Sequence, residues 1–333
     1  MKNAFIGTSL YGLVILVSGA FAGGSALASD LVVVDRTHSE VLELKLQNGR
    51  ERESHVLQAG SGPAFGITID EEKNIYVTHQ GDEPEFDGSV VVKRYGSDSF
   101  ELLVPADAEL NGGLGKPFYP IVRGDTLFVS SWLTHQVLMF DKNTGESLGA
   151  FVDVDATTGL GEGGLVNPRG IVFGPEGNLY VNSSGTDETL VYDGESGEYL
   201  GVFLDTAAHG IHVPCGVVFD HRGWVAIASA STNVDVNGEY EGGFAFFDWD
   251  GNLLRRERAG GVCGLERTPD GKLLAGATQL EQIRIYSLDW EEGEYETLRE
   301  GAKFPDMTLR RYSKPRWDKG RMNPRRHGRS RCK

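Results

Sequence analysis

The chain has 333 residues, of which 40% are hydrophobic and 24% are charged, and these globular proportions exclude a chain that is disordered throughout. Its 45 glycines follow no Gly-X-Y period, which excludes collagen and indicates many tight turns. The formal net charge of -16 excludes nucleic acid as a partner of the folded body, because the two would repel each other.

The beginning of the chain has the layout of a secretory signal peptide, which we predict over residues 1–28. Lys2 precedes an apolar run at 10–22, and a small-residue stretch ends at Ala26-Leu27-Ala28. Glycines interrupt the apolar segment, which is also too short for a stable membrane span. We therefore expect export to the periplasm or the extracellular space.

A repeat unit of four short apolar runs occupies residues 167–205. Glycine-containing turns separate the four runs, which are Gly170–Phe173, Leu179–Asn182, Thr189–Tyr192 and Tyr199–Leu204. Four antiparallel strands of this length are typical of one blade of a β-propeller.

The second run of this unit recurs along the chain. Its copies begin 44, 52, 52, 45 and 49 residues apart, at 31, 75, 127, 179, 224 and 273. Such spacings indicate propeller blades rather than helical repeats. The first copy lacks a preceding inner strand, and we predict that Phe304–Leu309 supplies it and closes the ring. The expected fold is an all-β, six-bladed β-propeller over 29–312 with terminal strand closure, and we expect a monomer.

The end of the chain is basic, unlike the rest. Residues 303–333 contain twelve Lys or Arg and two Asp, a local charge of +10, so residues 1–302 carry -26. We predict that 313–333 is a disordered basic tail, because it has too few aliphatic residues to form a core. It could be an electrostatic arm, dock on the acidic body, or have no function.

The repeat carries a family resemblance. The pattern P-x-G-(apolar)-x-F-G-P-x-G-N-L-Y-V, followed by a Y/F-D-x-x-T/S-G hairpin, resembles the NHL-type repeats of secreted bacterial six-bladed propellers. The wider group includes SMP-30/gluconolactonase-like and streptogramin lyase-like proteins. The resemblance covers 62–288 and is strongest over 115–205. It implies the fold more than the chemistry, because one scaffold hosts many functions.

The catalytic motifs of those relatives are absent from this sequence. The lactonase-like relatives hold a divalent metal with the glutamate of an E-G-P motif, and the corresponding segment here is Ser61-Gly62-Pro63. The sequence also contains no G-x-S-x-G, Walker or H-E-x-x-H motif. These departures favour a binding module over an enzyme.

The residues at the start of each inner strand are predicted to surround the central channel on one face, which we call the top face. Arg169 is one of them and could clamp an anion. Three aromatic residues of the third blade, Phe118, Tyr119 and Trp132, could form a stacking platform for a ring-bearing ligand. Alternatively, Phe118 and Tyr119 plug the channel.

Cys215 and Cys263 occupy equivalent positions in consecutive blades, and three interpretations remain open. They could form a disulfide, as export favours, or remain buried thiols. They could also join His209 and His212 in a metal site, because H-x2-H-x2-C spacing supplies ligands that zinc or copper prefers. Calcium is a further possibility at the acidic segments 82–87 and 235–241.

Two functions follow from these patterns. The first is a secreted, non-catalytic propeller that presents its top face to an unidentified small molecule or protein. The alternative is a metal-assisted hydrolase or lyase, with His209, His212 and Cys215 as its metal ligands and Arg169 as an anion clamp.

Overall fold

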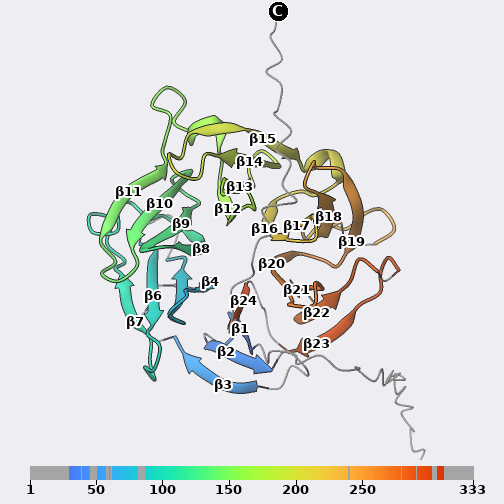
Figure 1. Cartoon of the computed structure of the whole chain (residues 1–333), viewed down its shortest axis with the longest axis horizontal. Helices are drawn as coiled ribbons and strands as arrows, with labels where there is room; N and C mark the ends of the chain where they lie inside the picture. Colours follow the sequence, from blue (N-terminus) through green and yellow to red (C-terminus); the bar gives the residue numbers. More distant parts are fainter. Residues whose placement is uncertain are drawn as a thin grey trace, which may run out of the picture.

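The structure is a computed structural model that describes residues 30–38, 40–45, 51–57, 60, 62–81, 87–238, 241–278, 280–289, 291–301 and 306–310. The predicted signal peptide and the basic tail lie outside these residues. Six four-stranded antiparallel sheets stand around a central axis as blades (Figure 1). The all-β, six-bladed propeller is therefore confirmed.

The first three blades each place four strands from the axis outward. Blade one consists of β24 (Met307–Arg310), β1 (Asp30–Asp35), β2 (Glu40–Lys45) and β3 (Glu51–Val56). Blade two consists of β4 (Ala64–Ile69), β5 (Ile75–His79), β6 (Ser89–Lys93) and β7 (Glu101–Val104). Blade three consists of β8 (Pro117–Arg123), β9 (Thr126–Ser131), β10 (Gln136–Asp141) and β11 (Ser147–Val152).

The other three blades repeat this arrangement. Blade four consists of β12 (Pro168–Phe173), β13 (Leu179–Ser183), β14 (Glu188–Tyr192) and β15 (Tyr199–Asp205). Blade five consists of β16 (Pro214–Asp220), β17 (Trp224–Ser229), β18 (Gly243–Asp248) and β19 (Leu253–Arg258). Blade six consists of β20 (Val262–Arg267), β21 (Leu273–Ala277), β22 (Gln282–Tyr286) and β23 (Glu296–Glu300).

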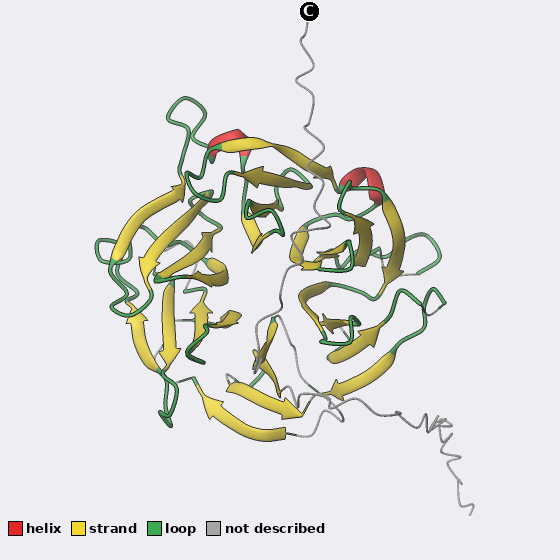
Figure 2. Ribbon diagram, in the orientation of Figure 1, coloured by secondary structure: helices red, strands yellow, loops and turns green. Residues whose placement is uncertain are grey.

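Helical structure among the described residues is confined to two short 3-10 turns (Figure 2). They are η1 (Glu162–Gly164) and η2 (Ala207–His209), and each connects one blade to the next. Within the described ranges, no helix has the length and apolar character needed to cross a membrane.

Blade one is completed by both ends of the described chain. β24 pairs antiparallel with β1 from Asp30 opposite Arg310 to Val33 opposite Met307. The Val34 amide also donates to the Asp306 carbonyl oxygen at 3.2 Å. This is the predicted closure, and it covers an edge of β1 that would otherwise be open to pairing with another chain.

The inner strands of blades two to six are all irregular at the same position. The pairing of each inner strand with its neighbour shifts register between Ala64 and Ile67, Pro117 and Pro120, Pro168 and Ile171, Pro214 and Val217, or Val262 and Leu265. A β-bulge of this kind changes the direction of a side chain. The residues inside these bulges are those that the sequence predicted to surround the axis.

A glycine inside the bulge lets neighbouring blades approach closely. A Cβ atom added to Gly170 would lie 2.0 Å from the carbonyl oxygen of Cys215 in the next blade. The same addition to Gly216 would place a Cβ 2.0 Å from the carbonyl oxygen of Cys263. This approach explains why glycine follows the axial residue in the repeated P-x-G pattern.

The hydrophobic core is divided among the blade interfaces. Between blades six and one, for example, Leu31 and Leu44 pack with Leu274, Ile283 and the closing residue Met307. Since each blade buries one face against each neighbour, the ring is a set of interlocking layers with no single centre.

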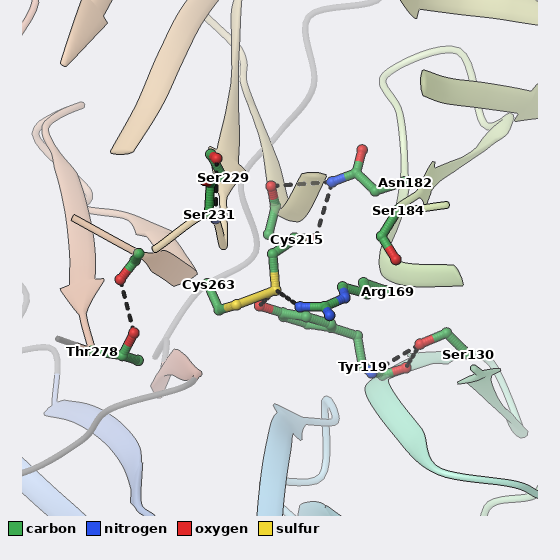
Figure 3. Close-up of a disulfide and its surroundings, with 12 residues drawn as sticks. Tyr119, Ser130, Arg169, Asn182, Ser184, Cys215, Ser229, Ser231, Cys263 and Thr278 are labelled. Carbon is green, nitrogen blue, oxygen red and sulfur yellow. Dashed lines mark hydrogen bonds between the residues drawn. A yellow bond between two sulfur atoms is a disulfide. The ribbon is translucent and has the colours of Figure 1, made fainter. Parts of the chain in front are cut away.

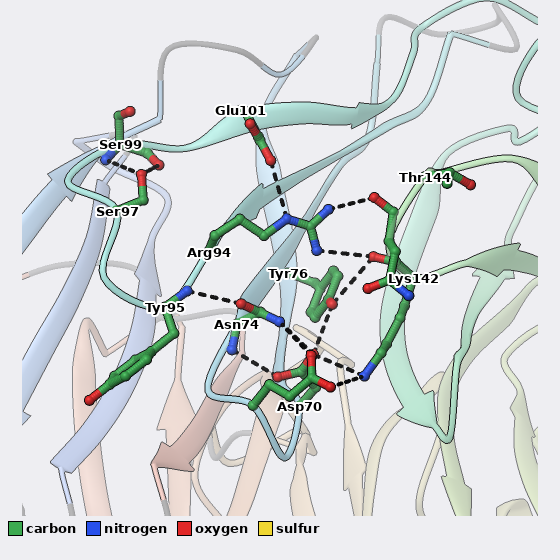
Figure 4. A network of polar contacts seen from close by, with 12 residues as sticks. Asp70, Asn74, Tyr76, Arg94, Tyr95, Ser97, Ser99, Glu101, Lys142 and Thr144 are labelled. Atoms are coloured by element: carbon green, nitrogen blue, oxygen red, sulfur yellow. Dashed lines mark hydrogen bonds and ion pairs between the residues drawn. The ribbon is translucent and has the colours of Figure 1, made fainter.

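Polar side chains form a contact network between blades two and three (Figure 4). The network includes the turn between β4 and β5, which lies on the face opposite the top face. The Tyr76 hydroxyl donates to the Asp70 carboxylate at 2.9 Å, and Lys142 Nζ lies 3.5 Å from the same oxygen atom. Arg94 donates to the carbonyl oxygens of Lys142 and Asn143 at 3.3 and 2.7 Å. These contacts satisfy buried polar groups at the interface, and we assign them a structural role.

Candidate functional site

The two predicted axial cysteines are bonded to each other. Cys215 of β16 and Cys263 of β20 form a disulfide, and their α-carbons lie 5.0 Å apart (Figure 3). This result selects one of the three interpretations of the cysteines. The β-bulges of consecutive blades turn both side chains toward the axis, within the range of α-carbon distances that a disulfide requires.

Arg169 and Tyr119 lie against this disulfide (Figure 3). Arg169 Nη1 and the Tyr119 hydroxyl are each 3.8 Å from Cys215 Sγ. The Arg169 guanidinium also lies over the Phe118 ring, 4.7 Å from its centroid. Blades three, four, five and six therefore all contribute to one cluster at the axis, which we call the axial cluster: Phe118, Tyr119, Arg169, Cys215 and Cys263.

Most of the axial cluster is buried. Phe118 is 3% exposed and Tyr119 is 8% exposed, so these rings fill the axis instead of offering an open stacking platform. Arg169 and Trp132, by contrast, are partly exposed. Arg169 is therefore the member of the axial cluster that is most accessible to solvent.

The predicted metal site is not assembled, and this corrects the interpretation drawn from H-x2-H-x2-C. Cys215 and Cys263 are joined in a disulfide, so neither has a thiolate to donate. The His209 ring packs on Phe247 at 5.2 Å, and His212 Nδ1 lies 2.9 Å from Asp187 Oδ2. The part of the chain that the structure describes contains no group of three or more His, Cys, Asp or Glu placed to hold a metal.

The acidic segments proposed for calcium are only partly described. Residues 82–86 and Glu239 lie outside the described residues. Asp235 is ion-paired, with its Oδ2 atom 2.9 Å from Arg258 Nη1. This ion pair gives Asp235 a structural role on the surface.

Two cations near the axis were missed by the sequence analysis. Lys116 Nζ lies 4.6 Å from the centroid of the Trp132 ring, and the Arg36 guanidinium lies 5.8 Å from that of Phe65. Arg36 follows the second strand of blade one, and Lys116 precedes the inner strand of blade three. Both positions belong to the top face. Their place on this face is the one feature of the sequence that could have pointed to them. We call Arg36, Lys116 and Arg169 the cation cluster.

The pKa values of Lys116 and Arg169, two members of the cation cluster, are lowered. Partial burial lowers the pKa of Lys116, and the nearby charges of Arg169 and Arg36 lower it further. Burial also lowers the pKa of Arg169. Lys116 is therefore near enough to both guanidinium groups for their charges to act on it.

A buried carboxyl group lies deeper at the axis. Burial raises the pKa of Asp306 well above its ordinary value, and the charge of Glu266 raises it further. Asp306 Oδ2 accepts a hydrogen bond from the Ile67 amide at 2.8 Å. Burial likewise raises the pKa of Tyr119, with a further contribution from Asp306. The environment at the axis below the cation cluster thus favours the neutral, protonated forms of Asp306 and Tyr119.

A separate hollow of about 350 Å³ lies between blades three and four on the face opposite the top face. It is lined by Arg123, Phe128, Met139 and Phe151, together with Glu195 and its neighbours. Arg123 is ion-paired with Glu195 and lies 4.6 Å from the centroid of the Phe173 ring. Arg123 therefore shares with Arg169 a position over a phenylalanine, but its charge is already neutralised.

Comparison with known proteins identifies the fold. No family model matches the chain, and no curated protein matches it in sequence. A chain of a nidogen/laminin complex has a TM-score of 0.62 and 16% identity, over 84% of this chain and 98% of that one. A candidate 6-phosphogluconolactonase from Bacteroides uniformis has a TM-score of 0.55 and 15% identity, over 85% of this chain and 99% of that one. At these identities the likeness shows the fold alone, and by that fold the chain is a six-bladed β-propeller.

Proposed function

We propose that the protein is an exported, non-catalytic binding module that holds a small-molecule ligand on its top face, where the axis meets the surface. One observation carries this proposal. The bulges of five blades aim their residues at the axis, and the residues there differ in chemistry although the surrounding repeat is regular. A few polar groups converging among aromatic rings are typical of a ligand site.

We further propose that the protein belongs with the NHL-repeat, SMP-30-like propellers and is exported. The repeated P-x-G and hairpin patterns support the family. The signal-peptide layout of residues 1–28 supports export, and the disulfide agrees with an oxidising compartment.

The proposed ligand enters from the top face and does not depend on a metal. The alternative of a metal-assisted hydrolase or lyase required His209, His212 and a cysteine thiolate, and the described residues do not bring those ligands together. The binding module requires no metal ligands, and contacts among Tyr119, Arg169 and Cys215 support it. It is therefore the function that the geometry supports best.

The test is affinity selection from a defined mixture of monosaccharides, aromatic acids and nucleosides, with the retained compounds measured by mass spectrometry. Native protein is expected to retain at least one compound, and Arg169→Ala is expected to release it. The matched control is Arg123→Ala, since Arg123 also lies over a phenylalanine but on the opposite face. Retention of nothing, or equal loss in the control, would overturn the proposal. A stoichiometric transition metal in protein purified without chelator would instead support the alternative function, a metal-assisted hydrolase or lyase.

A further inference from the structure

The cation cluster is built on a continuous aromatic surface at the top of the axis. The rings of Phe65 and Phe118 meet edge to face, with their centroids 4.5 Å apart. Arg36 lies over the first ring and Arg169 over the second. Each guanidinium group therefore lies over one ring of a contacting aromatic pair.

Two of these cations lack the usual acidic partner. In the described part of the chain, neither Arg36 nor Arg169 forms an ion pair with a carboxylate, and Arg36 donates to the Gln80 side chain at 3.4 Å. Several other arginines are paired with a carboxylate: for example, Arg258 lies 2.9 Å from Asp235 and Arg267 lies 3.3 Å from Asp220. In a chain with a net charge of -16, carboxylates are plentiful, yet none in the described ranges is paired with either of these two guanidinium groups.

Lys116 brings a third positive charge to the same place from the loop before β8. Its Nζ atom lies 4.6 Å from the centroid of the Trp132 ring, and its pKa is lowered by burial and further by the charges of Arg169 and Arg36. Like charges near one another destabilise the unliganded protein. A bound anion would relieve that repulsion, and this is the arrangement found where proteins hold phosphate or carboxylate groups.

We propose that Arg36, Lys116 and Arg169 bind the anionic group, a phosphate or a carboxylate, of a small ligand seated at the top of the axis. This inference deepens the proposed function and rests on it. The guanidinium groups present paired N–H donors, which suit the two oxygens of a carboxylate or phosphate. The acidic body restricts the ligand to a small molecule, because a polyanion would be repelled beyond the cluster.

The test is a calorimetric titration of the full chain with inorganic pyrophosphate, with citrate, and with uncharged glucose as the reference, at low ionic strength. Saturable binding is expected for one or both anions. Arg169→Gln is expected to weaken it at least about tenfold, the change that the loss of one charge-assisted contact produces. The matched control, Arg123→Gln, is expected to stay within about twofold because its cation lies on the opposite face and is already ion-paired. Affinity is expected to fall as salt is added.

Two further variants keep the test valid if Arg169→Gln disturbs the axis. Arg169→Lys retains the charge but not the planar fork, so its affinity should lie between those of native protein and Arg169→Gln. Lys116→Gln removes a cation from a loop outside the axial cluster and should also weaken binding. A thermal melt of each variant establishes that it is folded before titration.

The outcomes separate the possibilities. Binding of pyrophosphate alone assigns the site to phosphate, binding of citrate alone assigns it to carboxylate, and both support a general anion site. The inference is overturned if neither anion binds, or if Arg123→Gln weakens binding as much as Arg169→Gln does. If anions bind but the affinity selection retains no organic compound, the anion site at the cation cluster is supported and the proposed small-molecule function is overturned.

Discussion

Asn182 shows how one side chain holds the axial cluster in place. It lies in the second strand of blade four and is fully buried. Its Nδ2 atom donates to the carbonyl oxygens of Cys215 and Gly216 in blade five, at 3.0 and 3.2 Å. Its Oδ1 atom accepts from the Thr189 hydroxyl at 2.7 Å. Since every polar atom of this amide has a partner across or within a blade, the strand that carries the disulfide has a fixed position.

Thr78 performs the corresponding task between blades two and three. Its hydroxyl donates to the Phe118 carbonyl oxygen at 2.7 Å and accepts from the Gly66 amide at 2.9 Å. The polar residues of the second strands thus satisfy the backbone groups that the bulges leave free. They position the axial residues without touching a ligand.

Asp306 supports a prediction about pH. Burial raises its pKa well above the ordinary value, so the native state holds this proton more tightly than the unfolded state does. Its contribution is therefore most favourable in acid and is lost as pH rises from the ordinary aspartate range through the raised pKa. Asp306→Asn keeps an oxygen that can accept from the Ile67 amide but removes the titration. Urea unfolding across this pH range should show a smaller decline for the variant. Identical slopes in both proteins would contradict the assignment.

At the scale of elements, the disulfide joins two inner strands across a blade interface. β16 and β20 belong to blades five and six, and the cross-linked residues are 48 apart in sequence. A cross-link over such a loop restricts the unfolded chain, and removal of one typically costs about 2–4 kcal/mol. The bond also fixes the sulfur atom against which Arg169 rests.

We predict that replacing both Cys215 and Cys263 with alanine lowers the free energy of unfolding by about 2–4 kcal/mol. Guanidinium unfolding monitored by circular dichroism measures this change. Native protein treated with dithiothreitol in denaturant provides the matched comparison and should show a similar loss. If reduced native protein is as stable as oxidised protein, the disulfide does not stabilise the ring.

Repetition made most of the elements predictable from the sequence. The run predicted at Leu179–Asn182 is β13 (Leu179–Ser183), and the closing segment predicted at Phe304–Leu309 contains most of β24 (Met307–Arg310). Alternating apolar residues and flanking glycines within these segments are enough to predict strands there. Because Cys215 and Cys263 occupy equivalent positions in consecutive blades, the sequence also indicated a disulfide between them as one of three interpretations.

The site was less predictable because the ring assembles it from non-repeating positions. Arg36 and Lys116 belong to blades one and three, and no spacing in the sequence connects them to Arg169. His209 and His212 show the opposite failure. They are close in sequence, but one packs on Phe247 and the other pairs with Asp187. Side-chain direction in an irregular loop is decided by tertiary contacts that sequence spacing does not report.

At the scale of the whole molecule, β24 completes blade one. Met307 is 2% exposed and packs with residues of blades one and six. The Asp306 carboxyl group also reaches the Ile67 amide of blade two. The closing segment therefore contacts three blades and holds the ring shut.

We predict that a chain ending at residue 305 lacks the cooperative unfolding of the native protein, because β1 loses its inner partner and the core between blades six and one is opened. Calorimetry and light scattering measure this as a broadened, lower transition and as aggregation. A chain ending at Arg310 keeps all of β24 and is the matched control. A sharp transition at the native temperature in the shorter chain would contradict the role given to β24.

Closure by β24 also has a consequence for biosynthesis. Because β24 is made after every other strand among the described residues, the nascent protein carries β1 with an unpaired backbone edge until β24 has been synthesised. The ring cannot close on the ribosome before Met307–Arg310 has been translated. Chaperones that shield such an edge, or a transport route that accepts unfolded chains, would therefore bear directly on the yield of native protein.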